Sequence, residues 1–144
     1  MTTFIEILKE DHQKVKSLFS EMEKGGSSEI FSKIEEALKV HMDAEEKFLY
    51  PALEKHDKEM REKTLEAFEE HHVTKQSIKE IAKVSQSDER WKAKVSVLKE
   101  MIDHHVEEEE KQLFPMAKKA LDKNTIQDIT TKIQQAMSKA HGTK

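Results

Sequence analysis

Two segments of the chain carry nearly the same residues, and each contains side chains that commonly bind metals. One begins at His41 and the other at His105; of their eleven positions, six are identical and three more are conservative. Each segment places a Glu four residues after its His, at Glu45 and Glu109. On a helix this spacing puts both side chains on one face, with about 5–6 Å between Cβ atoms. The repeat therefore predicts a metal site assembled from two related halves.

Composition narrows the chemistry of that site. The chain has 144 residues, which favours one domain, and it contains no Cys. Thiolate ligands and Cys nucleophiles are therefore excluded, and a metal would be held by imidazole and carboxylate groups. Such ligands suit iron, manganese or zinc.

Charge and hydropathy indicate a water-soluble helical protein. Charged residues make up 38% of the chain and hydrophobic residues 35%, with only three Gly and two Pro, which favours long solvated helices. The net charge is −4, and Lys and Glu are interspersed, so no basic face for nucleic acid is expected. Neither a signal-peptide core nor an apolar run of membrane-spanning length is present, so we expect a cytoplasmic protein without membrane contact.

Apolar residues recur at alternating three- and four-residue intervals, which is the spacing of helices that pack in a bundle. Thr2 or Thr3 is expected to cap the first helix, with Glu6 completing a capping box. Helix breaks are expected at residues 25–28 and 85–88, where small polar residues gather. Four antiparallel helices joined by short loops predict an all-α, up-down-up-down four-helix bundle.

The two Pro residues and the C-terminal segment complete this prediction. Pro51 is expected to kink or break its helix one turn after the His-Glu pair, and Pro115 repeats this arrangement. Residues 1–122 should form the bundle. Residues 123–144 should add a short amphipathic helix and a tail, and that helix has an apolar stripe that could dock on the bundle or on another chain.

The repeat also includes one His from the first helix of each half. Asp11 and His12 followed by Lys16 match Glu70 and His71 followed by Lys75. Six side chains thus occupy positions where the bundle pattern calls for apolar residues: His12, His41, Glu45, His71, His105 and Glu109.

Burying these groups without compensation would be costly. An unpaired buried ion costs several kcal/mol, whereas a whole domain is stable by only about 5–15 kcal/mol. A pair of divalent or trivalent cations would provide the compensation. Each Glu would then bridge both metals, and each metal would take two His.

An ordered set of short motifs resembles the hemerythrin-like, HHE cation-binding family over roughly residues 3 to 120. The motifs are Asp11-His12, His41-x3-Glu45-Glu46, Leu49-Tyr50-Pro51, Glu70-His71-His72, His105-x3-Glu109-Glu110 and Leu113-Phe114-Pro115. The resemblance implies a four-helix bundle with a non-haem di-iron centre. Its two iron ions would be oxo- or hydroxo-bridged, with the Glu carboxylates also bridging.

One departure from the family pattern bears on function. Oxygen-carrying hemerythrins have a second His on the third helix, four residues after the first, where this chain has Lys75, or Gln76 if counted from His72. With four His instead of five, both metals could keep an exchangeable position. The set resembles instead the bacterial branch linked to peroxide or nitric oxide reduction, iron handling and oxygen or redox sensing.

Several residues allow more than one interpretation. His71 is favoured over His72 as the ligand, and His104 is expected to face solvent or to contact a ligand. Glu46 and Glu110 fall outside the helix seam and are interpreted first as solvated or cap-like charges, with hydrogen bonds to a ligand His as the alternative. Tyr50 is expected to be mainly a core residue that could also donate a proton toward the site. Lys75 either extends to solvent or faces an open coordination position.

The sequence supports three functional hypotheses. The first is a di-iron redox protein that handles a small oxidant, namely O2, peroxide or nitric oxide, with a peroxide- or nitric-oxide-reducing activity in redox or stress defence left open. The second is an oxygen, iron or redox sensor, or a metal-binding module without turnover. The third is a metal-free structural bundle, ranked last. Zinc or manganese could replace iron, and the protein is expected to be a monomer or a weak homo-oligomer.

Overall fold

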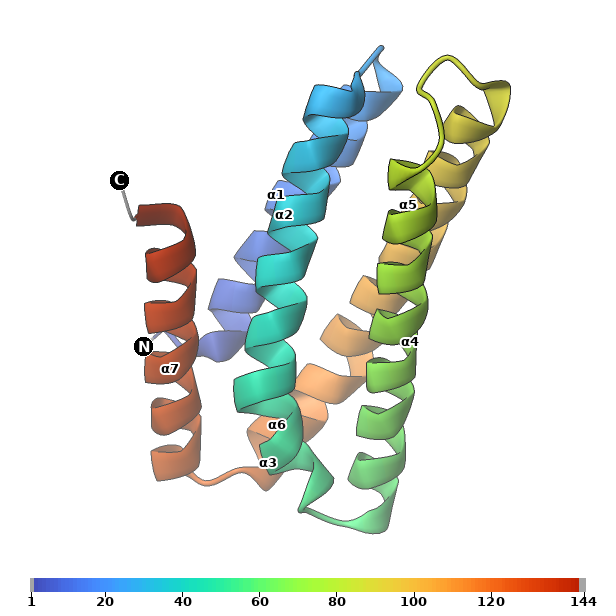
Figure 1. The fold of residues 1–144 in the computed structure, drawn as a ribbon. Coiled ribbons are helices and arrows are strands. Elements are labelled where there is room, and N and C mark those ends of the chain that lie inside the picture. Colours follow the sequence, from blue (N-terminus) through green and yellow to red (C-terminus); the bar gives the residue numbers. More distant parts are fainter. Residues whose placement is uncertain (1, 143–144) are drawn as a thin grey trace.

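The computed structural model describes residues 2–142, which contain helices and no strand. Four long helices form an up-down-up-down bundle, as the apolar spacing predicted (Figure 1). They are α1 (Phe4–Glu23), α2 (Ser28–Ala44), α4 (Lys58–Ala82) and α5 (Glu89–Glu108). Helices α1 and α2 form one hairpin, and α4 and α5 form the second, so the sequence repeat corresponds to two similar halves of the bundle.

Polar caps begin the long helices. Thr3 caps α1 in the predicted capping box, in which its backbone N–H donates to Glu6 Oε1 at 2.7 Å. Side-chain oxygens of Ser27, Asp57 and Asp88 cap the other three helices in the same way. Gly25, with φ of +110°, lies in the turn between the first two helices, where a residue with a Cβ atom would be strained.

Each His-Glu helix widens into one π-helical turn and continues beyond its Pro. Segment η1 (Glu45–Leu49) leads from α2 into α3 (Tyr50–Glu54), and η2 (Glu109–Leu113) leads from α5 into α6 (Phe114–Ala120). The sequence predicted a kink or a break one turn after the motif, and the helix does not break there. Pro lacks an N–H and its ring would clash with the carbonyl four residues earlier. The wider π-helical turn before each Pro accommodates its ring, so the helix continues past the Pro.

Helix α7 (Lys123–Gly142) lies against one half of the bundle. It packs on α1, α2 and η1, and Figure 1 shows it beside these helices on the side away from α4. Its side chains Ile129 and Ile133 are buried there, and the backbone N–H of Phe4 donates to Thr130 Oγ1 at 2.9 Å. This helix is as long as α1, although the sequence predicted a short one.

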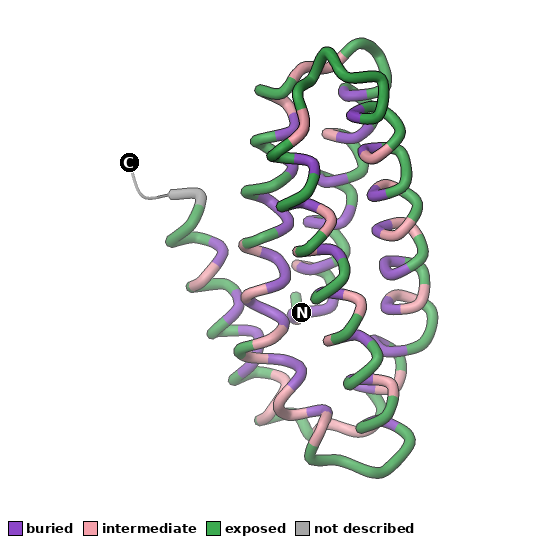
Figure 2. Tube along the Cα trace, turned by 45° about the vertical axis from the view of Figure 1, so that its right-hand side comes forward, coloured by how far each residue is buried: buried purple, intermediate pink, exposed green. Residues whose placement is uncertain are grey.

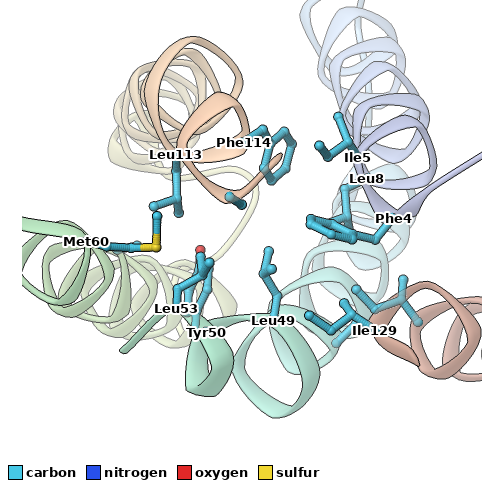
Figure 3. Packing of buried hydrophobic residues seen from close by; sticks show 14 of the residues in the cluster. Phe4, Ile5, Leu8, Leu49, Tyr50, Leu53, Met60, Leu113, Phe114 and Ile129 are labelled. Atoms are coloured by element: carbon cyan, nitrogen blue, oxygen red, sulfur yellow. The ribbon is translucent and has the colours of Figure 1, made fainter. Parts of the chain in front are cut away.

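The apolar core forms two clusters, and buried residues face the bundle axis along all four helices (Figure 2). The first cluster lies near the π-helical turns and includes Phe4, Leu49, Tyr50 and Phe114 (Figure 3). The second lies toward the other end of the bundle and includes Trp91. Along α1, His12 falls between Leu8 of the first cluster and Val15 of the second, so the polar residues of the site lie between two apolar layers.

Candidate metal centre

All six side chains predicted to bind metal converge in one buried place. Two come from α2 and η1, two from α5 and η2, and one each from α1 and α4. None is more than 8% exposed: His12, His41, Glu45, His71, His105 and Glu109. Of the two neighbouring imidazoles, His71 lies in the cluster whereas His72 is exposed, which agrees with the preference for His71 as the candidate ligand.

The six residues fall into two groups, each with the geometry of a candidate metal position. His12 and His41 meet one oxygen of Glu45 and one of Glu109, and His71 and His105 meet Glu45 in a second group. Within each group the candidate ligand atoms lie within 4.8 Å of one another. We refer to these as position 1 and position 2.

Each carboxylate spans both positions. Glu45 places Oε2 at 3.3 Å from His41 Nε2 and Oε1 at 3.1 Å from His71 Nε2. Glu109 places Oε1 at 3.1 Å from His12 Nε2 and Oε2 at 3.5 Å from His105 Nε2. Two carboxylates that each present one oxygen to either pair of imidazoles are arranged to bridge two cations.

The hydrogen bonds among these residues leave some buried nitrogen and oxygen atoms without a partner, and a bound metal would supply one. Among the described residues, Glu45 Oε2 and His105 Nε2 are the buried side-chain atoms without a hydrogen-bond partner. His12 Nε2 and His41 Nε2 lie 3.1 Å apart, so two ring nitrogens point at the same place. Because unpaired buried polar atoms are costly, a cation between these nitrogens and oxygens would stabilise the arrangement.

A carboxylate also holds the outer ring nitrogen of every one of the four His. The Nδ1 atoms of His12, His41, His71 and His105 lie 2.6–2.8 Å from Glu110, Asp11, Glu46 and Glu70 respectively. An ionised carboxylate can only accept, so Nδ1 carries a proton in each pair and Nε2 is directed inward. This is the arrangement that orients metal-binding His in proteins.

The first interpretation of Glu46 and Glu110, as solvated charges, was therefore wrong. Glu46 follows Glu45 on η1 but binds His71 of the other half, and Glu110 on η2 likewise binds His12. Lys75 does not face the centre either. Its Nζ lies 3.0 Å from Glu46 and supports the carboxylate that orients His71.

Charges of opposite sign shift the pKa values of the buried groups. Burial has the largest single effect on the pKa of His105 and lowers it, but the charges and hydrogen bonds of Glu109, Glu70 and Glu45 together outweigh burial and raise the pKa to about 10. Burial likewise opposes ionisation of Glu109, but the charge of His105 and hydrogen bonds from the imidazoles hold its pKa well below the usual value. The pKa of His41 is raised well above 6.5, against the effect of burial, by Glu45 and Asp11.

Comparison with known proteins agrees with this geometry. The hemerythrin HHE cation binding domain matches the chain over residues 3–117. The chain belongs to this family. Its fold also matches the crystal structure of a hemerythrin HHE cation binding domain-containing protein from Mycobacterium kansasii, with a TM-score of 0.84 and 22% identity over 99% of this chain and 89% of that one.

A curated relative of this HHE domain is larger. It is described as a DNA nickase from Nostoc sp. (strain PCC 7120 / SAG 25.82 / UTEX 2576) and is 29% identical over 138 residues. The match covers 93% of the present chain but only 39% of the relative's length. In the part of the HHE domain that the structure describes, residues 2–142, no helix is long and apolar enough to cross a membrane.

Tyr50 makes the two halves of the HHE domain unequal. Its side chain is fully buried, and its hydroxyl donates to Glu109 Oε2 at 2.7 Å while lying 3.1 Å from Glu45 Oε1 and 3.3 Å from His71 Nε2. The equivalent residue of the other half is Phe114, whose ring stacks on His12 without a hydroxyl. A polar hydroxyl group therefore borders position 2 but has no counterpart at position 1.

Tyr50→Phe is expected to destabilise the metal-free protein by about 1.5–3 kcal/mol, because the buried carboxylate of Glu109 loses a donated hydrogen bond. Urea unfolding of the metal-free protein measures this loss. Phe68→Leu is a control that trims the ring packed edge-on against Tyr50 and leaves the hydroxyl in place. If metal-free Tyr50→Phe were as stable as the wild type, the hydroxyl would not be holding Glu109.

Proposed function

We propose that this HHE domain binds two iron ions through the six converging residues and uses them on a small oxidant, namely O2, peroxide or nitric oxide. One observation carries this proposal: each of the two carboxylates presents one oxygen to each pair of imidazoles. A site for a single cation would not need two separate pairs of His that are both approached by the same two Glu carboxylates.

The donor set is compatible with iron, and the proposed handling of an oxidant needs a metal that changes its oxidation state, which zinc does not. Four imidazole nitrogens with two carboxylates suit iron, manganese and zinc, and the lack of Cys removes the softer ligands. Two bound irons would supply Lewis acidity and an exchange of electrons with the oxidant. The chain itself fixes the ligand nitrogens through the four Nδ1–carboxylate pairs, so that little reorganisation is needed when a metal binds.

The surroundings admit only a small molecule. A cavity of about 20 Å³ adjoins the four His and is otherwise lined by Thr74 and by apolar side chains of α1, α2 and α5. A cavity of this size holds about one water-sized molecule. Its apolar lining suits an uncharged diatomic or a peroxide better than a bulky organic substrate.

Tyr50 provides the proton-bearing group of the site. Burial and the neighbouring carboxylates of Glu109 and Glu45 raise its pKa well above 10, so the hydroxyl keeps its proton at neutral pH. Because that proton is directed at Glu109 Oε2, Tyr50 holds it next to position 2. A reaction that consumes protons there would find one within hydrogen-bond distance.

A sensor remains the second candidate because α7 packs directly on η1, the turn that carries Glu45. A change in the metal state that moved Glu45 would act on the turn that α7 covers. In a sensor, turnover would be negligible while the packing of α7 changed with the oxidation state. Hydrogen exchange in α7, measured for the reduced and oxidised protein, distinguishes the two functions.

The test of the proposal begins with protein loaded anaerobically with ferrous iron and then oxidised. We expect one iron for each of the two positions and a visible absorption band that changes on adding peroxide, azide or nitric oxide. Consumption of peroxide or nitric oxide over many equivalents separates an enzyme from a sensor. Iron content near zero after loading would contradict the proposed function.

A further inference from the structure

The two similar halves of the bundle differ in what covers them. The α1–α2 face carries α7, whereas no helix among residues 2–142 takes the equivalent place on the α4–α5 face (Figure 1). Side chains on that face are exposed or half-buried, Glu66 and His104 being exposed. Solvent thus approaches the metal centre from one side of the bundle more closely than from the other.

The sequence repeat shows that this difference is built into the residues. When His12 is aligned with His71, and His41 with His105, five apolar residues under or beside α7 correspond to polar ones on the open face. They are Phe4, Ile7, Val40, Ala44 and Phe48, which correspond to Lys63, Glu66, His104, Glu108 and Gln112. All five of these positions are polar on the open face, which therefore lacks the apolar surface that α7 covers on the other half.

A narrow cleft of about 20 Å³ on this open face is lined in part by residues of the metal centre. Its rim includes Glu66, Glu70 and Glu108, and its inner wall includes His105 and Glu109. Lys63 also lies at the rim, where its Nζ donates to Gln112 Oε1 at 2.6 Å. Three acids and one base give the rim a net negative character that attracts cations.

Two of these rim residues, Glu70 and Glu108, form a third candidate metal group with the neighbouring His104. Ligand atoms of Glu70, His104 and Glu108 lie within 4.8 Å of one another, and His104 Nε2 is 3.5 Å from Glu108 Oε1. Glu70 also holds His105 Nδ1 at 2.6 Å, so the outer group is directly linked to a residue of position 2. Behind it, His105 Nε2 is one of the two buried atoms that lack a hydrogen-bond partner among the described residues.

We propose that Glu70, His104 and Glu108 form an outer cation site, where ferrous iron binds before passing through the cleft to position 2. This inference rests on the proposed function, since it needs a metal centre to supply. One imidazole with two carboxylates is a suitable ligand set for a divalent transition metal. The exposure of His104, whose side chain is 65% accessible, makes the site a place of rapid exchange.

The experiment compares iron uptake by two matched double variants. His104→Ala with Glu108→Gln removes the outer site, and His72→Ala with Glu107→Gln makes the same chemical change at exposed positions outside it. Metal-free protein is mixed anaerobically with ferrous iron, and a chelator traps unbound iron at successive times. We expect uptake to slow about tenfold in the outer-site variant, as for loss of electrostatic steering, with an unchanged final content. The control variant should match the wild type.

The outcomes separate this inference from the proposed function. Equal uptake rates in the outer-site variant and the wild type would overturn the outer site but leave the di-iron centre intact. A wild type that never takes up two irons would overturn both. In addition, Zn²⁺ titrated into protein already filled at both positions should show a weaker third binding event that the outer-site variant lacks. Its absence from the wild type would also overturn the outer site.

Discussion

Replacing Glu45 and Glu109 together with Ala is expected to reduce the iron content from two ions per chain to nearly none. Each carboxylate spans both positions, so the double variant removes two oxygen ligands from either metal and leaves two imidazoles for each. Without negative ligands, two cations so close together would also repel each other. Elemental analysis of protein loaded with ferrous iron and passed through a desalting column measures the loss.

A matched control removes two solvent-facing Glu, one on α4 and one on α5. Glu69→Ala with Glu107→Ala changes the net charge equally and should keep both irons. Circular dichroism distinguishes loss of metal from loss of fold, and the more conservative Glu45→Gln with Glu109→Gln provides a second variant if the Ala version unfolds. Full iron content in the folded double variant would show that the carboxylates do not hold the metals.

The metal-free protein is expected to lose several kcal/mol of stability as the pH rises from about 6.5 to about 10. His105, with a folded-state pKa of about 10 against an ordinary value of 6.5, binds a proton in the folded protein that the unfolded chain releases in this range. His41 and His71 have pKa values raised in the same direction. Their contribution is fully present below pH 6.5 and is lost as the pH rises through the folded-state pKa values.

At acid pH, the titration of Glu109 should lower the stability of the metal-free protein. Its folded-state pKa lies well below the ordinary 4.5, so its contribution is present above that value and is lost as the pH falls. Stability of the metal-free protein should therefore be greatest between about pH 4.5 and 6.5. Urea unfolding as a function of pH measures this profile, and His105→Gln should flatten its alkaline side. A flat profile in the wild type would mean that the imidazoles carry no extra protons.

Metal should reverse the alkaline trend. Imidazole must lose a proton to bind a metal through Nε2, so metal affinity rises with pH over the range in which the metal-free protein weakens. Protein saturated with metal should thus remain stable at pH 8–9, where the metal-free form has lost part of its stability. The two profiles, measured side by side, distinguish a metal centre from a buried network of ion pairs.

The fold was predictable because the apolar spacing indicates which face of each helix is buried, and the polar residues that interrupt this spacing lie on the same face. Six polar residues stand at seam positions, for example His12 between Leu8 and Val15, and the structure buries all six. Caps such as Thr3 and Ser27 could be identified locally, because the side chain that caps a helix lies within a few residues of the N–H it accepts from. Whether these six residues bind metal remains a prediction that the geometry supports.

The position of Tyr50 was harder to predict. On a regular α-helix, a residue five positions after Glu45 points away from it, so Tyr50 was interpreted mainly as a core residue. The π-helical turn, in which the Tyr50 N–H binds the Glu45 carbonyl, places residues five apart nearly in line. The Pro that follows each motif was the available signal, since it removes a backbone donor and crowds the preceding turn.

The carboxylates that orient the His could not be assigned from periodicity alone. Glu46 and Glu110 act across the bundle on His71 and His12, so their partners lie 25 and 98 residues away. Periodicity within one helix indicates the face on which a residue lies, but it does not indicate which residue of another helix that side chain contacts. Asp11 and Glu70, by contrast, occupy equivalent positions of the sequence repeat. Each hydrogen-bonds to a His of the neighbouring helix.

Anomalous X-ray scattering at the iron absorption edge, from crystals of the iron-loaded protein, tests the central claim most directly. The account predicts two peaks, one beside His12 and His41 and one beside His71 and His105, with Glu45 and Glu109 contacting both. A single peak, or peaks that either carboxylate fails to bridge, would contradict it.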